Sequence, residues 1–93
     1  MLKTIRTIKE LNFYQLMQVY SEGNMENARD FYPHLSETEG IFQAEQDFHS
    51  YLQVFFSQPG AVYAVWLADN KYVSALRLEP YKDGLLLSGL ETA

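Results

Sequence analysis

Three apolar runs in the last third of the chain dominate its hydrophobic pattern. Residues 61–91 read AVYAVWLA, DN, KYVSALRLEPYK, DG and LLLSGLE, so turn dipeptides separate runs of aliphatic, aromatic and β-branched residues. This pattern predicts a three-stranded antiparallel meander with tight turns at Asp69-Asn70 and Asp83-Gly84. The first run, Ala61–Ala68, is apolar on both alternating faces, which is typical of a central strand that is covered on both sides.

The turns also predict the register of the meander, because a two-residue loop fixes which residues lie opposite one another. A loop at Asp69-Asn70 places Trp66 opposite Val73 and Ala64 opposite Ala75. A turn at Asp83-Gly84 places Lys82 opposite Leu85.

The amino-terminal part begins with a short strand and changes to a helical period. Lys3–Ile8 alternates in a mixed pattern that suits an edge strand. Apolar residues then recur at helical spacing from Lys9 to about Ser21, and Thr7 with Glu10 has the spacing of a capping box. Gly23 and Asn24 weaken the helix. A short second helical face follows, ended by Pro33, and its members are Met25, Ala28 and Tyr32.

A longer helix is predicted to start at Ser36, with Glu39 as its capping partner. Pro59-Gly60 ends this helix and turns the chain into the meander. Its apolar stripe comprises Ile41, Ala44, Phe48, Leu52 and Phe55.

These elements predict one domain, residues 1–93, with an α+β fold in the order β-α-α-β-β-β. We expect a mostly antiparallel sheet with two helices on one face. No remaining segment covers the other face or the outer edge of the last strand, Leu85–Glu91. A hydrophobic edge of this kind pairs or aggregates. We therefore expect a partner chain or a larger polypeptide to supply the missing cover.

Composition narrows the class of protein. Hydrophobic residues make up 47% and charged residues 20%, which is a globular composition. The net charge of −5 argues against nucleic acid and anionic membranes as partners. The chain has no cysteine, which excludes disulfides, zinc thiolates and a thiol nucleophile. No leader pattern and no apolar run of about 20 residues is present, so a cytoplasmic location is expected.

Few residues of the sequence lie in a pattern that is typical of a catalytic, metal-binding or nucleotide-binding site. His34 and His49 lack metal-ligand spacing, so we favour two unrelated surface histidines over a metal pair. Ser88 does not lie in a G-x-S-x-G sequence, and no nucleotide-binding glycine motif occurs. Gly89 has two interpretations: a bulge or close backbone approach, or tolerance of a small residue beside Leu78.

The hairpin WLADNKYVSALRLEP followed by LLLSGLETA, in this element order, resembles the amino-terminal half of the GNAT superfamily of acyl-CoA N-acyltransferases. The resemblance spans essentially all 93 residues. It implies half of an acyl-CoA N-acyltransferase fold and an acetyltransferase that moves an acetyl group from acetyl-CoA to a small-molecule or peptide amine. The family's pyrophosphate loop, [RQ]-x-x-G-x-[GA], does not occur in this sequence. We therefore expect this chain alone to hold no cofactor and to be inactive.

The resemblance also implies site residues. The backbone of Gly89, Leu90, Glu91 and Thr92 corresponds to the strand that holds the acyl carbonyl and pantetheine of acetyl-CoA. Glu91 is the candidate for water-mediated deprotonation of the amine. The residues expected to border the amine acceptor are Phe31, Tyr32 and His34, although aromatic residues here also fit a packed loop.

Three hypotheses remain open at this point. The chain is a truncated acetyltransferase domain that needs its carboxyl-terminal half, or it is a non-catalytic binding module that forms a homodimer. The third is an unrelated small α+β binding protein whose pocket lies between helices and sheet.

Overall fold

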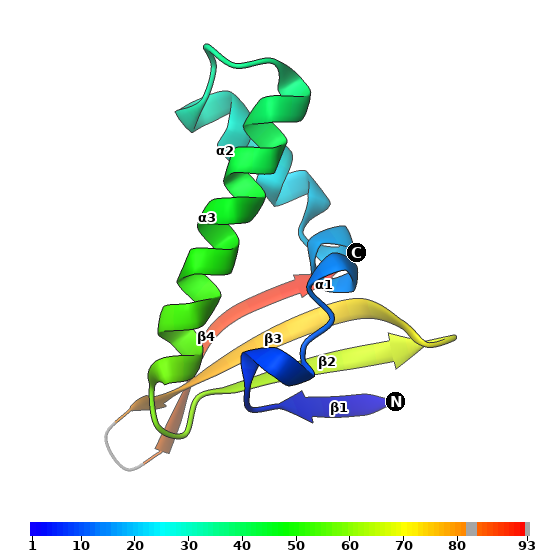
Figure 1. Cartoon of the computed structure of the whole chain (residues 1–93). Helices are drawn as coiled ribbons and strands as arrows, with labels where there is room; N and C mark the ends of the chain where they lie inside the picture. Colours follow the sequence, from blue (N-terminus) through cyan, green and yellow to red (C-terminus); the bar gives the residue numbers. More distant parts are fainter. Residues whose placement is uncertain (82–83, 93) are drawn as a thin grey trace.

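A computed structural model of the chain describes residues 1–81 and 84–92, and it has the predicted α+β architecture. Three α-helices and one 3₁₀ turn lie between the first strand and a three-stranded meander (Figure 1). In chain order the elements are β1 (Leu2–Ile5), η1 (Ile8–Glu10), α1 (Phe13–Val19), α2 (Ser21–Phe31), α3 (Glu37–Ser57), β2 (Val62–Ala68), β3 (Lys71–Tyr81) and β4 (Gly84–Thr92).

The four strands form one antiparallel sheet in the order β1-β2-β3-β4. The edge position predicted for the first strand is confirmed, although β1 is shorter than the expected Lys3–Ile8. The central position predicted for β2 is also confirmed. Its residues Tyr63 and Val65 are fully buried beneath the helices, and Val62 and Ala64 are buried on the opposite face.

The expected first helix is wrong in its bounds, because the segment divides into η1, α1 and α2. Asn12 is the N-cap of α1, and its Oδ1 accepts from the Gln15 N–H at 3.1 Å. The Thr7 hydroxyl donates to Glu10 Oε1 at 2.9 Å, but Thr7 caps no backbone N–H. A side-chain cap inside the segment therefore starts the α-helix later than predicted.

Gly23 and Asn24 were expected to weaken the helix, but they do not end it. Both residues lie inside α2, which packs along α3. Asn24 is buried, and its side-chain amide donates to Met17 Sδ at 3.5 Å. Packing against α3 outweighs the modest propensity cost of a glycine and an asparagine, which is about 1 kcal/mol for the glycine.

Helix α3 follows the prediction closely. The Ser36 hydroxyl accepts from the Glu39 N–H at 3.2 Å, as the capping pattern indicated. Ala44, Leu52 and Phe55 of the predicted stripe are buried. The helix ends at Ser57, and Gly60 takes a positive φ of 83° in the turn before β2.

The core lies between the helices and one face of the sheet. Its largest fully buried side chains are Tyr63, Phe55, Ile5, Leu16, Leu52 and Val65. Helix α1 packs against β3, whereas α2 and the first half of α3 project away from the sheet (Figure 1). The molecule is therefore elongated, with principal extents of 43 × 33 × 20 Å.

The first hairpin has the predicted turn but not the predicted register. Asp69 and Asn70 both have positive φ, at 53° and 63°, as a type I′ turn requires. Trp66 pairs with Ser74 and Ala64 with Leu76, because a β-bulge at Val73 adds one residue to β3. The expected partners of Trp66 and Ala64 were therefore wrong by one residue.

The second hairpin is described only in part. Lys82 and Asp83 lie outside the described residues, but the predicted pairing of Lys82 with Leu85 is wrong, because Leu85 pairs with Pro80. Gly84 was expected in the turn, but it is the first residue of β4 and pairs with Tyr81.

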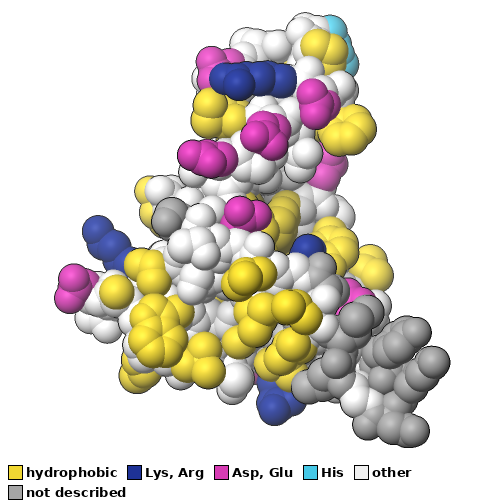
Figure 2. Space-filling view, turned by 180° about the vertical axis from the view of Figure 1, so that it is seen from behind, with side chains coloured by type: hydrophobic (Ala, Val, Ile, Leu, Met, Phe, Trp, Pro, Cys, Tyr) yellow, Lys and Arg dark blue, Asp and Glu magenta, His cyan; other side chains and the backbone are white. Residues whose placement is uncertain are grey.

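The sheet face opposite the helices is apolar and has no cover among residues 1–81 and 84–92. We define the apolar sheet face by Leu2, Ala64, Trp66, Leu76, Leu87 and Leu90, which the strand register places on one side. Figure 2 shows hydrophobic side chains gathered there. The outer edge of β4 also pairs with no described strand.

The cap of α3 gives the first testable prediction. Ser36→Ala removes the acceptor of the Glu39 N–H, so the free energy of unfolding should fall by about 1 kcal/mol. Urea denaturation followed by circular dichroism measures this change. Ser50→Ala is the matched control, because Ser50 is exposed within the same helix and the change there favours helix slightly. Equal midpoints for the two variants would contradict the assigned cap.

Candidate functional site

Strand β4 changes register directly before the stretch that the family resemblance singles out. Gly89 pairs with Arg77, but Leu87 already pairs with Leu78, so Ser88 is an extra residue in β4. Bulges of this kind bend a strand and are common at sheet edges and beside sites. Beyond the break, β4 pairs with β3 without interruption as far as Thr92.

Gly89 lies where the Arg77 side chain crosses β4. A Cβ atom added to Gly89 would lie 2.6 Å from Arg77 Nε and 2.8 Å from Arg77 Cζ, which no real side chain tolerates without movement. Of the two interpretations of Gly89, the bulge lies one residue earlier, at Ser88, and the group that approaches Gly89 closely is the Arg77 side chain and not another backbone. The expected neighbour was wrong, since Gly89 pairs with Arg77 and not with Leu78.

The Arg77 guanidinium, seated over Gly89, stacks on an aromatic ring from α3. Its Cζ lies 5.1 Å from the centre of the Tyr51 ring, which is cation–π distance. The Tyr51 hydroxyl reaches Glu79 Oε1 at 3.5 Å. Arg77 thus joins β3 and β4 to α3 and brings a positive charge beneath the helix layer.

Two buried phenols, those of Tyr20 and Tyr63, lie near Arg77 between the helices and the sheet. The Tyr20 and Tyr63 hydroxyls are 2.5 Å apart, and both side chains are almost fully buried. Burial raises the pKa of both phenols, and for Tyr63 the neighbouring Tyr20 adds to the shift. The positive charge of Arg77 opposes this rise in pKa but does not cancel it. Both phenols are therefore neutral near pH 7 and do not act as bases.

Glu91 lies near the Tyr20 phenol. It pairs with the buried Ala75, it is half-buried, and its negative charge contributes to the raised pKa of Tyr20. Leu90 is 67% exposed on the opposite sheet face, and Thr92 is exposed opposite Ser74. Among the four residues from Gly89 to Thr92, only Gly89 and Glu91 lie near Arg77 and the two buried tyrosines.

The residues expected to border the acceptor lie at the far end of the helical hairpin. Phe31 ends α2 and is 70% exposed, while His34 is exposed in the connection with its ring 6.4 Å from the Tyr32 ring. Phe31 and Tyr32 line a cavity of about 250 Å³, and its other lining residues are Asn27, Ala44, Asp47 and Phe48.

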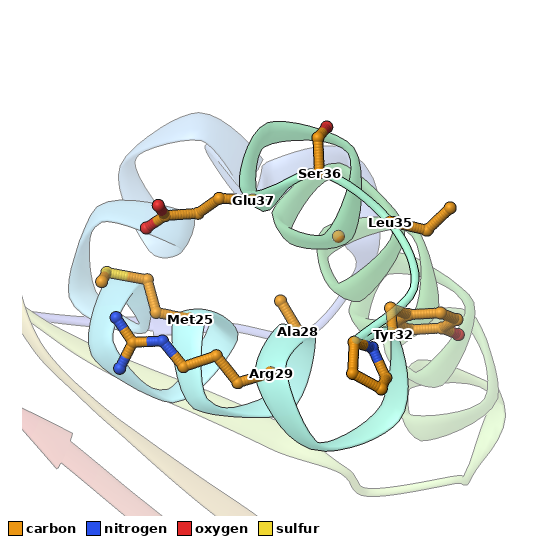
Figure 3. A pocket seen from close by; sticks show the side chains of 9 residues that line it. Met25, Ala28, Arg29, Tyr32, Leu35, Ser36 and Glu37 are labelled. Atoms are coloured by element: carbon orange, nitrogen blue, oxygen red, sulfur yellow. The ribbon is translucent and has the colours of Figure 1, made fainter.

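Tyr32 is held by an acidic neighbour. Its hydroxyl donates to Asp47 Oδ2 at 2.5 Å, and Gln43 Nε2 donates to Asp47 Oδ1 at 3.2 Å. The hydrogen bond to Asp47 is the main cause that raises the pKa of Tyr32. Tyr32 also borders a second cavity of about 240 Å³, where it lies opposite Arg29 and Glu37 (Figure 3).

The two groups of predicted site residues are not brought together. Figure 1 shows the α2–α3 connection at the tip of the helical hairpin, whereas β4 is an edge strand of the sheet. Among the described residues, the two cavities that Phe31 and Tyr32 line therefore include none of Gly89–Thr92. The cavities that Phe31 and Tyr32 line are formed by α2, α3 and the connection between them.

The histidines are separated in the same way. His49 packs edge-on against Phe13, with ring centres 5.1 Å apart, whereas His34 lies beside Tyr32. Within the described part of the chain, no three His, Cys, Asp or Glu side chains come close enough to hold a metal ion. Across the same residues, no helix has the length and hydropathy that crossing a membrane requires.

Sequence reasoning missed the group formed by Arg77 and the two buried tyrosines. The available signal was a single arginine inside the apolar run SALRLEP, two residues from the buried Ala75. A large charged side chain in such a stretch needs space on the neighbouring strand. Gly89, which pairs with Arg77, provides that space. Asp47 was missed because an exposed carboxylate on a helix has no feature in the sequence that indicates its contact with Tyr32.

Comparisons with protein-family models, with curated proteins and with solved structures found no match to this chain.

Replacement of Gly89 tests the close approach. Gly89→Ala should force the Arg77 side chain away from its place over the Tyr51 ring and lower the free energy of unfolding by about 0.5–1 kcal/mol, the usual value of a cation–π contact. Urea denaturation of the purified variant measures this cost. The control is Gly84→Ala in the same strand, since a Cβ at Gly84 meets no atom within 4 Å.

A double-mutant cycle assigns that cost to Arg77. In an Arg77→Ala background the Gly89→Ala change should be close to neutral, because the crowded side chain is gone. If Gly89→Ala costs the same free energy with and without Arg77, the steric explanation is wrong.

The tyrosine pair predicts sensitivity to alkaline pH. Below the ordinary tyrosine pKa of 10.0 the Tyr63 phenol is protonated in both the folded and the unfolded chain. Above it, unfolded Tyr63 ionises while the folded phenol keeps its proton, so the free energy of unfolding falls as pH rises. The slope should approach about 1.4 kcal/mol per pH unit for this group.

Tyr63→Phe should remove the Tyr63 contribution to that slope and leave the contribution of Tyr20, as measured by urea denaturation between pH 9 and pH 11 (roughly one unit either side of the reference value). Tyr14→Phe is the control, because Tyr14 is 73% exposed and should leave the slope unchanged. An equal slope in all three proteins would show that Tyr63 does not carry the effect.

Proposed function

We propose that this chain forms the acyl-holding half of an acetyltransferase-type domain, in which an acetyl group passes from acetyl-CoA to an amine. The observation that carries the proposal is the register break at Ser88 in an edge strand. It is followed by Gly89–Thr92, which pair with β3 on one side only. The element order, one strand, then a run of helices, then three strands, supports the same resemblance.

An edge strand of this kind suits a ligand that carries amide groups. Its outward N–H and C=O groups lack a strand partner among the described residues, and an extended pantetheine chain can pair with them as an added strand does. A backbone N–H close to the thioester carbonyl would stabilise the negative charge that develops on its oxygen.

The reaction would then need little from the side chains. The amine attacks the acetyl carbonyl, the new C–N bond forms, the C–S bond breaks, and the thiolate of coenzyme A leaves. In the proposal Glu91 accepts the proton of the amine through a water molecule. Phe31, Tyr32 and His34 border the amine acceptor in the proposal, and this requires the acceptor to reach from the hairpin tip towards β4.

Affinity for the cofactor should come from pantetheine alone. Pyrophosphate is usually bound by backbone N–H groups of a glycine-rich loop at a helix N-terminus, and the sequence contains no [RQ]-x-x-G-x-[GA] loop. Acetyl-CoA and S-acetylpantetheine should therefore bind the chain equally, with millimolar dissociation constants.

Amide chemical shifts of the ¹⁵N-labelled chain test the proposal. Titration with S-acetylpantetheine should move the resonances of Gly89, Leu90, Glu91 and Thr92 first, because their amides are the proposed contact. Adenosine 3′,5′-bisphosphate, which lacks pantetheine, is the matched control and should move none of them. Shifts confined to the α2–α3 cavities, or micromolar binding of acetyl-CoA, would contradict the proposal.

A further inference from the structure

The apolar sheet face is the largest feature that the acyl-transfer proposal does not use. Leu2 is 59% exposed, Trp66 49%, Leu87 54% and Leu90 67%. The strand register places Ala64 and Leu76 between them on the same face. Figure 2, seen from behind relative to Figure 1, shows hydrophobic side chains gathered on this side of the molecule.

The size of this face suits a protein interface. Its four most exposed side chains together present on the order of 500 Å² of apolar surface. An apolar patch of this size is near the upper end of what single subunits expose, and such patches are often functional. Two copies that meet through this face would bury on the order of 1,000 Å² in total, which is the lower end of the range for specific interfaces.

The charge distribution indicates which partner fits. Helices α2 and α3, with their connection, span residues 21–57 and carry seven acidic residues against Arg29 alone, a net charge of −6. The whole chain has a net charge of −5, so the rest carries +1. None of the six residues that define the apolar sheet face is charged. A basic partner would be attracted to the helices, which leaves the sheet face for an uncharged apolar surface.

We propose that two copies of this chain associate face to face through the apolar sheet face. Each copy then covers Trp66, Leu87 and Leu90 of the other, and the two sheets pack about 10 Å apart as in a β-sandwich. The acidic helices of the two copies lie on opposite outer sides, where their mutual repulsion is smallest. The outer edge of β4 stays open, so this proposal does not depend on acyl-CoA binding.

Sedimentation equilibrium of the full chain tests the association. The wild-type chain should be a dimer at tens of micromolar concentration. Leu87→Glu places a carboxylate in the interface and should weaken the dimer more than about a hundredfold, because an unpaired charge resists burial. The matched control is Phe42→Glu, since Phe42 is 60% exposed on α3, away from the sheet face, and its dimer should persist.

Fluorescence reports the same event independently, because Trp66 is the only tryptophan of the chain. Its emission should shift to the blue as the chain is concentrated, and it should not do so in Leu87→Glu. If Leu87→Glu does not fold, as judged by circular dichroism, Leu2→Glu at the exposed end of β1 replaces it. A monomeric wild-type chain overturns the proposal. A dimer that survives Leu87→Glu with unchanged Trp66 emission also overturns it, since it would indicate pairing along the edge of β4.

Discussion

Strand β2 is apolar on both faces, and the chain provides helices for only one of them. Tyr63 and Val65 are fully buried under the helices, while Val62 and Ala64 face the other way and owe their burial to neighbouring strands. A chain of 93 residues buries only about two-thirds of its unfolded surface. It cannot cover both sides of a four-stranded sheet, and this constraint explains why large apolar side chains remain in contact with solvent on the outer face.

The helix-covered side contains a polar feature that was not evident from the sequence pattern. Arg77 crosses the strand at Gly89, stacks on Tyr51, and holds a positive charge near the Tyr20 and Tyr63 phenols. The bulge at Ser88 and the glycine beside it make room for this side chain. The same local irregularity lies at the sheet edge where the proposed acyl site begins, so packing and the proposed chemistry depend on the same few residues.

The sequence predicts the strongly patterned elements of this fold well. Helix α3, its Ser36 cap, the central strand β2 and the type I′ turn at Asp69-Asn70 follow from local rules, and the structure has each of them. The register of the sheet did not follow, because the bulges at Val73 and Ser88 each insert a residue that carries no signal of its own. The division of the first helix depended on Asn12, whose capping role competes with that of Thr7. The site was less predictable still, since the contacts of Arg77 and Tyr32 arise only when α3 packs on its neighbours.

The central claim is that the apolar sheet face is a contact surface and not a solvated one. Isotope-filtered NMR on a mixture of labelled and unlabelled chain tests it most directly, because this method detects only contacts between different copies. The account predicts intermolecular contacts from the Trp66 ring to the methyl groups of Leu87 and Leu90. Intermolecular contacts along the β4 edge alone, or none at concentrations where the chain is stable, would contradict it.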